Sequence, residues 1–224
     1  MIKTSTEFIV GKHHRIIAEK LEKIASGELK RLIINMPPRH TKSEFASYLL
    51  PAWFLGQFPQ KKVIQTSHTA ELAVGFGRKV RNLVSSDAYK TIFPTVDLQS
   101  DSKAAGRWNT NAGGDYFAIG VGGAVTGKGA DLLIIDDPHS EQDAMNMSAL
   151  ERAYEWYTSG PRQRLQPGGK IVYATCSLLP EENQEQIAFF EENYPVKAEK
   201  PFLSTLPYLD QMDGFFGATL TLKN

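Results

Sequence analysis

The sequence has a single cysteine, no long hydrophobic run and no excess of charge of one sign. Cys176 cannot form an internal disulfide, so the fold does not depend on an oxidising compartment. The longest apolar runs, around 49–55 and 132–135, are far shorter than the about 18 residues that a membrane-spanning helix needs. Residues 1–12 are polar and mixed in charge, unlike a signal peptide. We therefore expect a cytoplasmic protein with no membrane partner.

Apolar residues make up 42% of the 224 residues and charged residues 22%, which excludes a disordered or collagen-like chain and predicts a globular protein. The 25 basic and 25 acidic residues cancel, so the whole chain lacks the basic character of a dedicated nucleic-acid binder. The charge is unevenly distributed, because 21 basic minus 17 acidic residues give +4 for residues 1–169, and 4 minus 8 give −4 for residues 170–224. This difference indicates two segments of different character.

Short apolar runs alternate with segments of helical periodicity, as is typical of α/β proteins. We predict strands at 31–35, 63–66, 116–121, 131–136 and 170–175, and a closing edge strand at 214–222. The run at 131–136 is apolar almost throughout, which is typical of a central parallel strand covered on both faces. Ser148 and Glu151 form a capping-box pattern that predicts the start of a helix. The predicted fold class is α/β, with a mainly parallel sheet and helices on both faces.

Residues 36–43, MPPRHTKS, lie between a predicted strand and a predicted helix and end in the Lys-Ser pair of a nucleotide phosphate loop, or Walker A motif. Met36 and Thr41 occupy the two glycine positions of that motif. Backbone N–H groups at the helix N-terminus would hold phosphate, Lys42 would reach the β and γ oxygens, and the Ser43 hydroxyl would bind Mg²⁺. The alternative interpretation is a proline turn that caps a helix and carries a solvated lysine.

A second motif, Leu132-Leu-Ile-Ile-Asp-Asp137, is an apolar strand that ends in two carboxylates, as in a Walker B motif. Asp136 would hold Mg²⁺ through water, and Asp137 would orient and deprotonate an attacking water. The alternative is an ordinary acidic turn that follows a parallel strand. The two motifs together predict a Mg²⁺-dependent nucleotide hydrolase.

Residues 36–44, 120–131 and 132–138 together resemble the ATPase domain of tailed-phage large terminase subunits, and the likeness covers about residues 8–169. The resemblance implies a P-loop NTPase-like fold and an ATP hydrolase that drives DNA into a prohead. A glycine-poor phosphate loop with an internal arginine is normal in that family. The resemblance implies that ATP is bound by Pro38, Arg39, His40, Thr41, Lys42 and Ser43. It also implies that Ser43 and Asp136 hold Mg²⁺ and that Asp137 and Arg39 act in catalysis.

The same resemblance implies partners and a compartment. The implied partners are double-stranded DNA, the terminase small subunit and the portal, with assembly into a homo-oligomeric ring in the host cell cytoplasm. Lys128 or Arg107 would serve as a cation acting across the ring interface, although a solvated surface charge is the alternative for each. His13 and His14 precede the first strand, where such motors hold adenine. A helix-cap histidine is the alternative there.

Residues 168–183, GGKIVYATCSLLPEEN, resemble the C-terminal part of bacterial 16S rRNA cytosine-5 methyltransferases of the Nop/Sun type, roughly over residues 164–224. In that family the cysteine of the T-C-S tripeptide attacks C6 of cytosine, so Cys176 would be the nucleophile and S-adenosylmethionine the methyl donor. A buried, inert thiol is the alternative for Cys176. No segment upstream of residue 164 fits the pattern of a binding pocket for S-adenosylmethionine well.

We therefore expect two parts, a terminase-like P-loop ATPase core at 1–169 and a methyltransferase-like segment at 170–224 that completes or flanks the sheet. Their joint would lie within 164–169, which makes the chain chimeric. The leading interpretation of function is Mg²⁺-dependent ATP hydrolysis by a packaging motor that lacks its nuclease domain. The alternatives are a fragment of an S-adenosylmethionine-dependent rRNA methyltransferase that uses Cys176, or an inactive fusion of the two.

Overall fold

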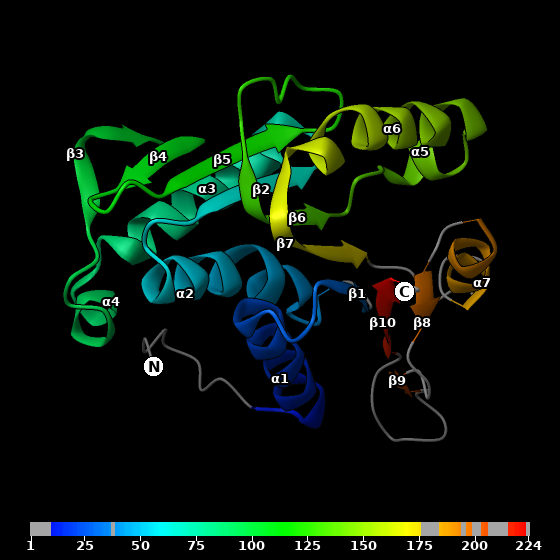
Figure 1. Ribbon diagram of the computed structural model, residues 1–224, viewed down its shortest axis with the longest axis horizontal. Coiled ribbons are helices and arrows are strands. Elements are labelled where there is room, and N and C mark those ends of the chain that lie inside the picture. Colours follow the sequence, from blue (N-terminus) through cyan, green and yellow to red (C-terminus); the bar gives the residue numbers. More distant parts are fainter. Residues whose placement is uncertain are drawn as a thin grey trace.

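The computed structural model describes residues 10–36, 39–175, 184–193, 196–198, 203–205 and 215–222. In this part of the chain ten strands form one sheet, in the order β3-β4-β5-β2-β6-β7-β1-β10-β8, with β9 paired to β10 (Figure 1). The strands are β1 (Arg31–Asn35), β2 (Lys62–Ser67), β3 (Leu98–Ala104), β4 (Arg107–Thr110), β5 (Asp115–Gly120), β6 (Ala130–Asp136), β7 (Leu165–Thr175), β8 (Val196–Ala198), β9 (Leu203–Thr205) and β10 (Phe215–Leu222). The five central strands, β5-β2-β6-β7-β1, are parallel, and the flanking pairs are antiparallel.

Helices cover both faces of this sheet. They are α1 (Lys12–Ser26), the π-helix η1 (Glu44–Leu49), α2 (Leu50–Gln57), α3 (Ala70–Val84), α4 (Asp87–Ile92), α5 (Glu141–Ala144), α6 (Met147–Ser159), the 3₁₀ helix η2 (Pro161–Arg164) and α7 (Gln184–Asn193). Apolar residues of α1, α2 and α3 form one core layer against the sheet, and Trp156 and Tyr157 of α6 join a second layer on the opposite face. The predicted α/β fold is confirmed.

The central strand β6 is buried on both sides, as its apolar sequence predicts. Leu132, Leu133 and Ile134 have no exposed surface, and they alternate between the two core layers. Burial of each such side chain contributes on the order of 1.5–3 kcal/mol. This strand therefore holds the Asp136 at its end in a rigid position.

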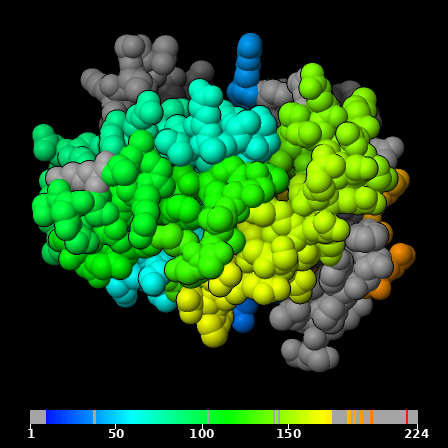
Figure 2. All heavy atoms as spheres, turned by 90° about the horizontal axis from the view of Figure 1, so that it is seen from above, coloured from blue at the N-terminus to red at the C-terminus, as the bar shows by residue number. Residues whose placement is uncertain are grey.

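The loop after β5 is fastened to α6. The Trp156 Nε1–H donates to the Gly123 carbonyl at 2.7 Å. In Figure 2 the green residues that include this loop meet the yellow residues of α6 and β7 on one face of the molecule. The connection between β5 and β6 is therefore held against α6.

Strand β7 pairs with β6 on one side and with β1 on the other, and its pairing with β6 shifts register between Leu165 and Lys170. The expected division into parts at 1–169 and 170–224 remains a prediction, although its boundary falls inside one strand of the sheet. Two local predictions are wrong. Strand β10 is not an edge strand, because it pairs with both β1 and β8. Helix α6 is capped by Asn146, whose side chain accepts from the Ala149 N–H, and not by Ser148.

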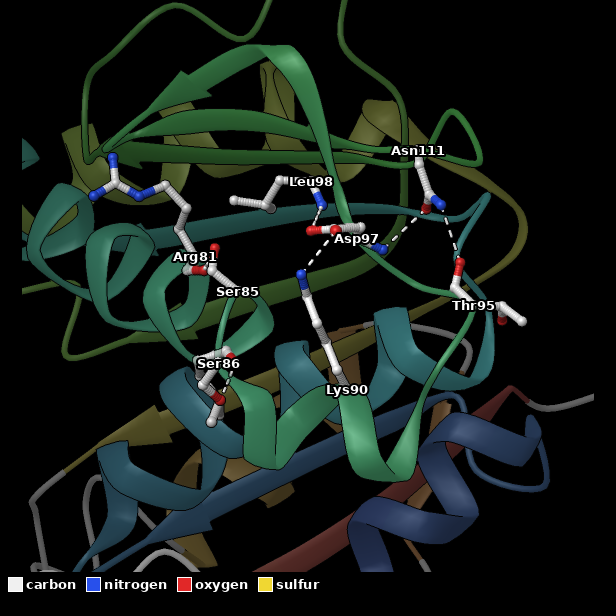
Figure 3. A network of polar contacts seen from close by, with 9 residues as sticks. Arg81, Ser85, Ser86, Lys90, Thr95, Asp97, Leu98 and Asn111 are labelled. Carbon is white, nitrogen blue, oxygen red and sulfur yellow. Dashed lines mark hydrogen bonds and ion pairs between the residues drawn. The ribbon is translucent and has the colours of Figure 1, made fainter.

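A polar network ties α4 to the start of β3 and to the turn after β4 (Figure 3). Lys90 Nζ donates to Asp97 Oδ2 at 2.8 Å, and the Asp97 N–H donates to Asn111 Oδ1 at 3.1 Å. Asn111 Nδ2 then donates to the Thr95 carbonyl at 3.0 Å. The network holds the antiparallel end of the sheet, away from the strand ends described below. No described helix has the length and apolar character that crossing a bilayer requires.

Candidate functional site

The two sequence motifs meet at the carboxyl edge of the parallel sheet. The phosphate loop follows β1, the two acids end β6, and β7 lies between these strands with Ala174 beside both Ile34 and Asp136. Neighbouring strands are about 4.8 Å apart, so the ends of β1 and β6 lie about 10 Å apart. A lysine side chain spans most of that distance, and the carboxyl edge of a parallel sheet is where α/β proteins bind ligands.

Lys42 bridges both carboxylates. Its Nζ lies 3.2 Å from Asp136 Oδ1 and 2.5 Å from Asp137 Oδ1. The Lys42 and Asp136 side chains are only 3% and 2% exposed. A buried charge is strongly unfavourable unless it is paired, and this pairing stabilises the ammonium inside the fold. The alternative of a solvated lysine is therefore wrong.

Two further side chains, which the sequence analysis missed, orient Asp136. The Ser47 hydroxyl donates to Asp136 Oδ2 at 2.6 Å, and Gln65 Nε2 donates to Ser47 Oγ at 3.1 Å. Both side chains are fully buried. Ser47 lies one helical turn after Ser43, on the π-helix η1, and this spacing is the one sequence signal for its position. Gln65, within a buried strand, offers no such signal.

Backbone strain is concentrated at this edge of the sheet. Among the described residues, three other than glycine have positive φ, namely Arg39 at 67°, Thr41 at 67° and Asp137 at 44°. Such conformations cost on the order of 1–3 kcal/mol each and cluster at functional sites. Thr41 occupies a glycine position of the phosphate-loop motif, and its φ of 67° explains why that motif prefers glycine.

Asp137 is held by its backbone, and its side chain is partly exposed. Its N–H donates to the Ala174 carbonyl at 2.9 Å, and its own carbonyl accepts from the His68 N–H at 3.0 Å. These bonds fasten Asp137 between the ends of β7 and β2. Its side chain is 37% exposed, in contrast to the buried Asp136. The two neighbouring acids therefore differ sharply in their access to water.

The segment after Asp137 begins α5 with a reciprocal cap. The Asp143 N–H donates to Ser140 Oγ, and the Ser140 N–H and hydroxyl both donate to Asp143 Oδ2. These hydrogen bonds hold the pKa of the Asp143 carboxyl below its usual range, and the nearby His139 and His68 lower this pKa further. The polar loop beside the site is thus locally fixed.

The remaining predicted site residues are placed as follows. Arg39 is exposed, and His40 and Ser43 are half-buried. The Ser43 hydroxyl caps no backbone N–H of the helix that it precedes. Pro38 and Cys176 lie outside the described residues.

The histidine and the two cations that the terminase resemblance singles out are also placed. His14 caps α1, because its Nδ1 accepts from the Gly11 N–H at 2.9 Å, and the helix-cap interpretation is confirmed for this residue. Arg107 is exposed on β4, as the surface interpretation predicts. Lys128 is not a solvated charge, because it lies 3.6 Å from Asp115 Oδ2 and packs over the Phe117 ring.

The five parallel central strands, with helices on both faces, form an α/β fold that is consistent with a P-loop or a Rossmann-type arrangement. The large terminase of bacteriophage HK97 has a similar structure, with a TM-score of 0.53 and 11% sequence identity over 86% of this chain and 39% of the terminase. That similarity shows the fold alone, and this chain spans about two fifths of the terminase. A methyltransferase homologue from Pyrococcus horikoshii aligns with a TM-score of only 0.35, at 14% identity over 91% of this chain and 82% of that one.

Sequence similarity points to a second group of proteins. Ribosomal RNA small subunit methyltransferase B from Salmonella paratyphi B, Salmonella newport and Salmonella heidelberg is in each case 46% identical over 67 residues, which cover 27% of this chain and 16% of the methyltransferase. This chain thus spans about a sixth of the length of these curated relatives. No family model matches the chain. Both expected resemblances are confirmed, the first in fold and the second in the sequence of a partial segment.

Proposed function

We propose that the chain binds and hydrolyses Mg·ATP as a motor domain related to large terminase subunits. The observation that carries this proposal is the approach of Lys42 to both strand-end carboxylates, beside the N-terminus of the helix that follows β1. Backbone N–H groups at a helix N-terminus bind phosphate, and a lysine next to paired acids is the arrangement that phosphoryl transfer uses. The similarity of fold to the HK97 large terminase is in keeping with this proposal.

Lys42 is the phosphate ligand in this proposal. Before nucleotide arrives, its ammonium contacts Asp136 and Asp137. The β and γ oxygens of a triphosphate provide a more highly charged partner, to which the ammonium turns when ATP binds. This movement releases Asp137 from its 2.5 Å contact with Lys42. Nucleotide binding therefore frees the carboxylate that the reaction needs.

Asp137 is the general base. Its side chain is 37% exposed, so a water molecule reaches it. As the water oxygen attacks the γ-phosphorus, Asp137 accepts a water proton, and the bond from the γ-phosphorus to the bridging oxygen breaks. The products are ADP and phosphate. Asp136, which is 2% exposed, does not have this access to solvent.

Asp136 and Ser43 would hold Mg²⁺. Asp136 Oδ1 is buried and accepts no hydrogen bond within the described residues, although Lys42 Nζ lies 3.2 Å away. Mg²⁺ prefers oxygen ligands and is commonly held by one or two carboxylates together with substrate phosphates. No group of three or more His, Cys, Asp or Glu side chains in the described part of the chain is arranged to hold a metal, so substrate phosphates and water would supply the remaining ligands of the proposed ion. When bound, the ion supplies charge neutralisation at the phosphates.

The proposed partners follow from the relationship to terminases. They are double-stranded DNA, the terminase small subunit and the portal, with the chain acting in a homo-oligomeric ring. Arg39, exposed on the strained loop, would contact the γ-phosphate or a neighbouring subunit. Pro38, His40 and Thr41 would form the ATP-binding loop together with Arg39.

Thermal unfolding with and without Mg·ATP tests this proposal. A ligand that binds only the folded state stabilises it by about 2.7 kcal/mol at a hundred times its Kd, so Mg·ATP should raise the Tm of the wild type. The variant Lys42→Met should not respond, whereas Lys90→Met, which breaks the Lys90–Asp97 ion pair of Figure 3, should respond like the wild type. A wild-type Tm that does not change, or an undiminished response of Lys42→Met, would show that the proposal is wrong.

The 46% identity to the rRNA methyltransferases favours a second candidate function. In that case Cys176 would attack cytosine with S-adenosylmethionine as the methyl donor. S-adenosylmethionine and RNA together should then protect Cys176 from alkylation, and neither should do so alone. If neither this assay nor the Mg·ATP assay gives a response, the chain is an inactive fusion.

A further inference from the structure

A hydrogen bond joins α1 to the phosphate loop. His14 is only 7% exposed, and its Nε2 lies 2.9 Å from Thr41 Oγ1. The two residues come from different elements, since His14 lies in the first turn of α1 and Thr41 comes just before Lys42. We call this pair the brace. Neither residue belongs to the group formed by Lys42, Asp136 and Asp137.

The surrounding contacts determine the direction of each hydrogen bond in the brace. The Gly11 N–H donates to His14 Nδ1 at 2.9 Å, so Nδ1 is an acceptor without a proton. In the neutral ring the remaining proton is on Nε2, which therefore donates to Thr41 Oγ1. The Thr41 hydroxyl proton is donated to the His40 carbonyl at 2.5 Å. Thr41 Oγ1 is thus held from both sides.

The brace acts on the most unfavourable backbone position of the loop. Thr41 has a φ of 67°, and a β-branched residue rarely adopts this conformation unless its surroundings enforce it. The Thr41 carbonyl also accepts from the Phe45 N–H at 3.0 Å, in the first turn of the helix that follows Lys42. The His14 ring stacks on the Phe45 ring, with centroids 5.4 Å apart and planes 8° apart. His14 therefore contacts both the loop and the helix.

We propose that His14 is a positioning residue of the nucleotide site. Through the brace it holds Thr41 in the left-handed conformation, which sets the direction of the loop N–H groups and of Lys42 towards the triphosphate. A loop with glycine at position 41 needs no such support, because glycine adopts positive φ without strain. The threonine in this chain needs it. The expected effect on nucleotide affinity rests on the function proposed above.

A double-mutant cycle tests this inference. The proteins are the wild type, His14→Ala, Thr41→Gly and the double variant, with KM and kcat for ATP and the Kd of Mg·ATP measured by calorimetry. Loss of one hydrogen bond corresponds to about a fivefold weakening. We expect His14→Ala to raise Kd and KM by about that factor in the wild type, with kcat changed less than about twofold. In the Thr41→Gly background His14→Ala should raise Kd by less than about twofold.

Two conservative variants separate the brace from the helix cap. The amide nitrogen of His14→Gln is placed to replace Nε2 and donate to Thr41, whereas the shorter His14→Asn replaces Nδ1 as the acceptor for Gly11. We expect His14→Gln to keep the wild-type Kd within about twofold and His14→Asn to weaken it like His14→Ala. The inference would be wrong if His14→Asn kept the wild-type Kd and His14→Gln weakened binding. It would also be wrong if His14→Ala raised Kd equally in the wild type and in the Thr41→Gly background.

Chemical unfolding keeps the inference testable without nucleotide. If the wild type does not bind Mg·ATP, the proposed function is wrong. The coupling between His14 and Thr41 is then tested by the urea midpoints of the same four proteins. Midpoint shifts of His14→Ala and Thr41→Gly that are not additive support a direct coupling between the two residues. Additive shifts overturn it.

Discussion

Lys42 and Asp136 form an ion pair of 3.2 Å in which both side chains are almost completely buried, at 3% and 2% exposure. They come from the loop after β1 and from the end of β6, which are not adjacent in the sheet. Two charges taken out of water in this way depend on each other. Removal of one partner leaves the other uncompensated, which typically costs about 3–5 kcal/mol.

The first prediction concerns this dependence. Asp136→Ala should lower the free energy of unfolding by about 3 kcal/mol, because it leaves Lys42 with Asp137 alone and removes the acceptor of Ser47. The double variant Lys42→Met/Asp136→Ala should lose less than the sum of the two single variants. Urea unfolding measures all three. Strictly additive losses would contradict a direct interaction.

The second prediction separates nucleotide binding from hydrolysis. Asp137→Asn keeps the shape of the side chain but removes its ability to accept a proton, so ATP hydrolysis should fall by a factor of about 10² or more. Binding of Mg·ATP should persist, because Lys42 and Asp136 remain. Single-turnover hydrolysis and calorimetry measure the two properties separately. A variant that hydrolyses ATP at the wild-type rate would exclude Asp137 as the base.

The third prediction concerns Ser47, the hydroxyl that orients Asp136. Ser47→Ala leaves Asp136 Oδ2 without this donor inside the fold, so the free energy of unfolding should fall by about 1–3 kcal/mol. Thr91→Ala is the matched control, because that exposed hydroxyl donates to the carbonyl of Asp87 in its own helix, and it should change stability by less than about 0.5 kcal/mol. Equal losses in the two variants would contradict the orienting role of Ser47. Thermal melting of both proteins provides the comparison.

The fourth prediction is a pH dependence. The folded-state pKa of Asp143 lies below its usual value because Ser140 donates to the carboxylate. A carboxyl with a lowered pKa stabilises the fold above its unfolded-state pKa, and this contribution disappears as the pH falls through the folded-state value. Asp143→Asn should therefore lower the Tm at pH 7, and the difference from the wild type should shrink below about pH 4. A difference in Tm that stays constant from pH 7 to pH 3 would contradict the hydrogen-bonded cap.

Local patterns predicted a large part of the fold. The strands around Leu132 and Ile33 were predicted because a buried strand is apolar over a short run, whatever its neighbours are. The place of β10 was predicted wrongly, as an edge of the sheet. A strand at the end of a sequence is no more typical of an edge than of an interior position, and only the pairing with β1 and β8 decides between them.

The sequence by itself determined which residues carry charge at the site, because Lys42 lies in a loop between strand and helix and Asp136 and Asp137 end an apolar strand. It also predicted a mainly parallel sheet, in which the carboxyl ends of these strands would share one edge. Only the tertiary structure decided that Ser47 and Gln65 orient Asp136 and that His14 contacts the loop before Lys42. Their contacts join segments far apart in the chain, and a hydrogen bond between distant segments has no local signature. The strain at Thr41 became visible for the same reason, because a backbone angle is a property of the folded chain.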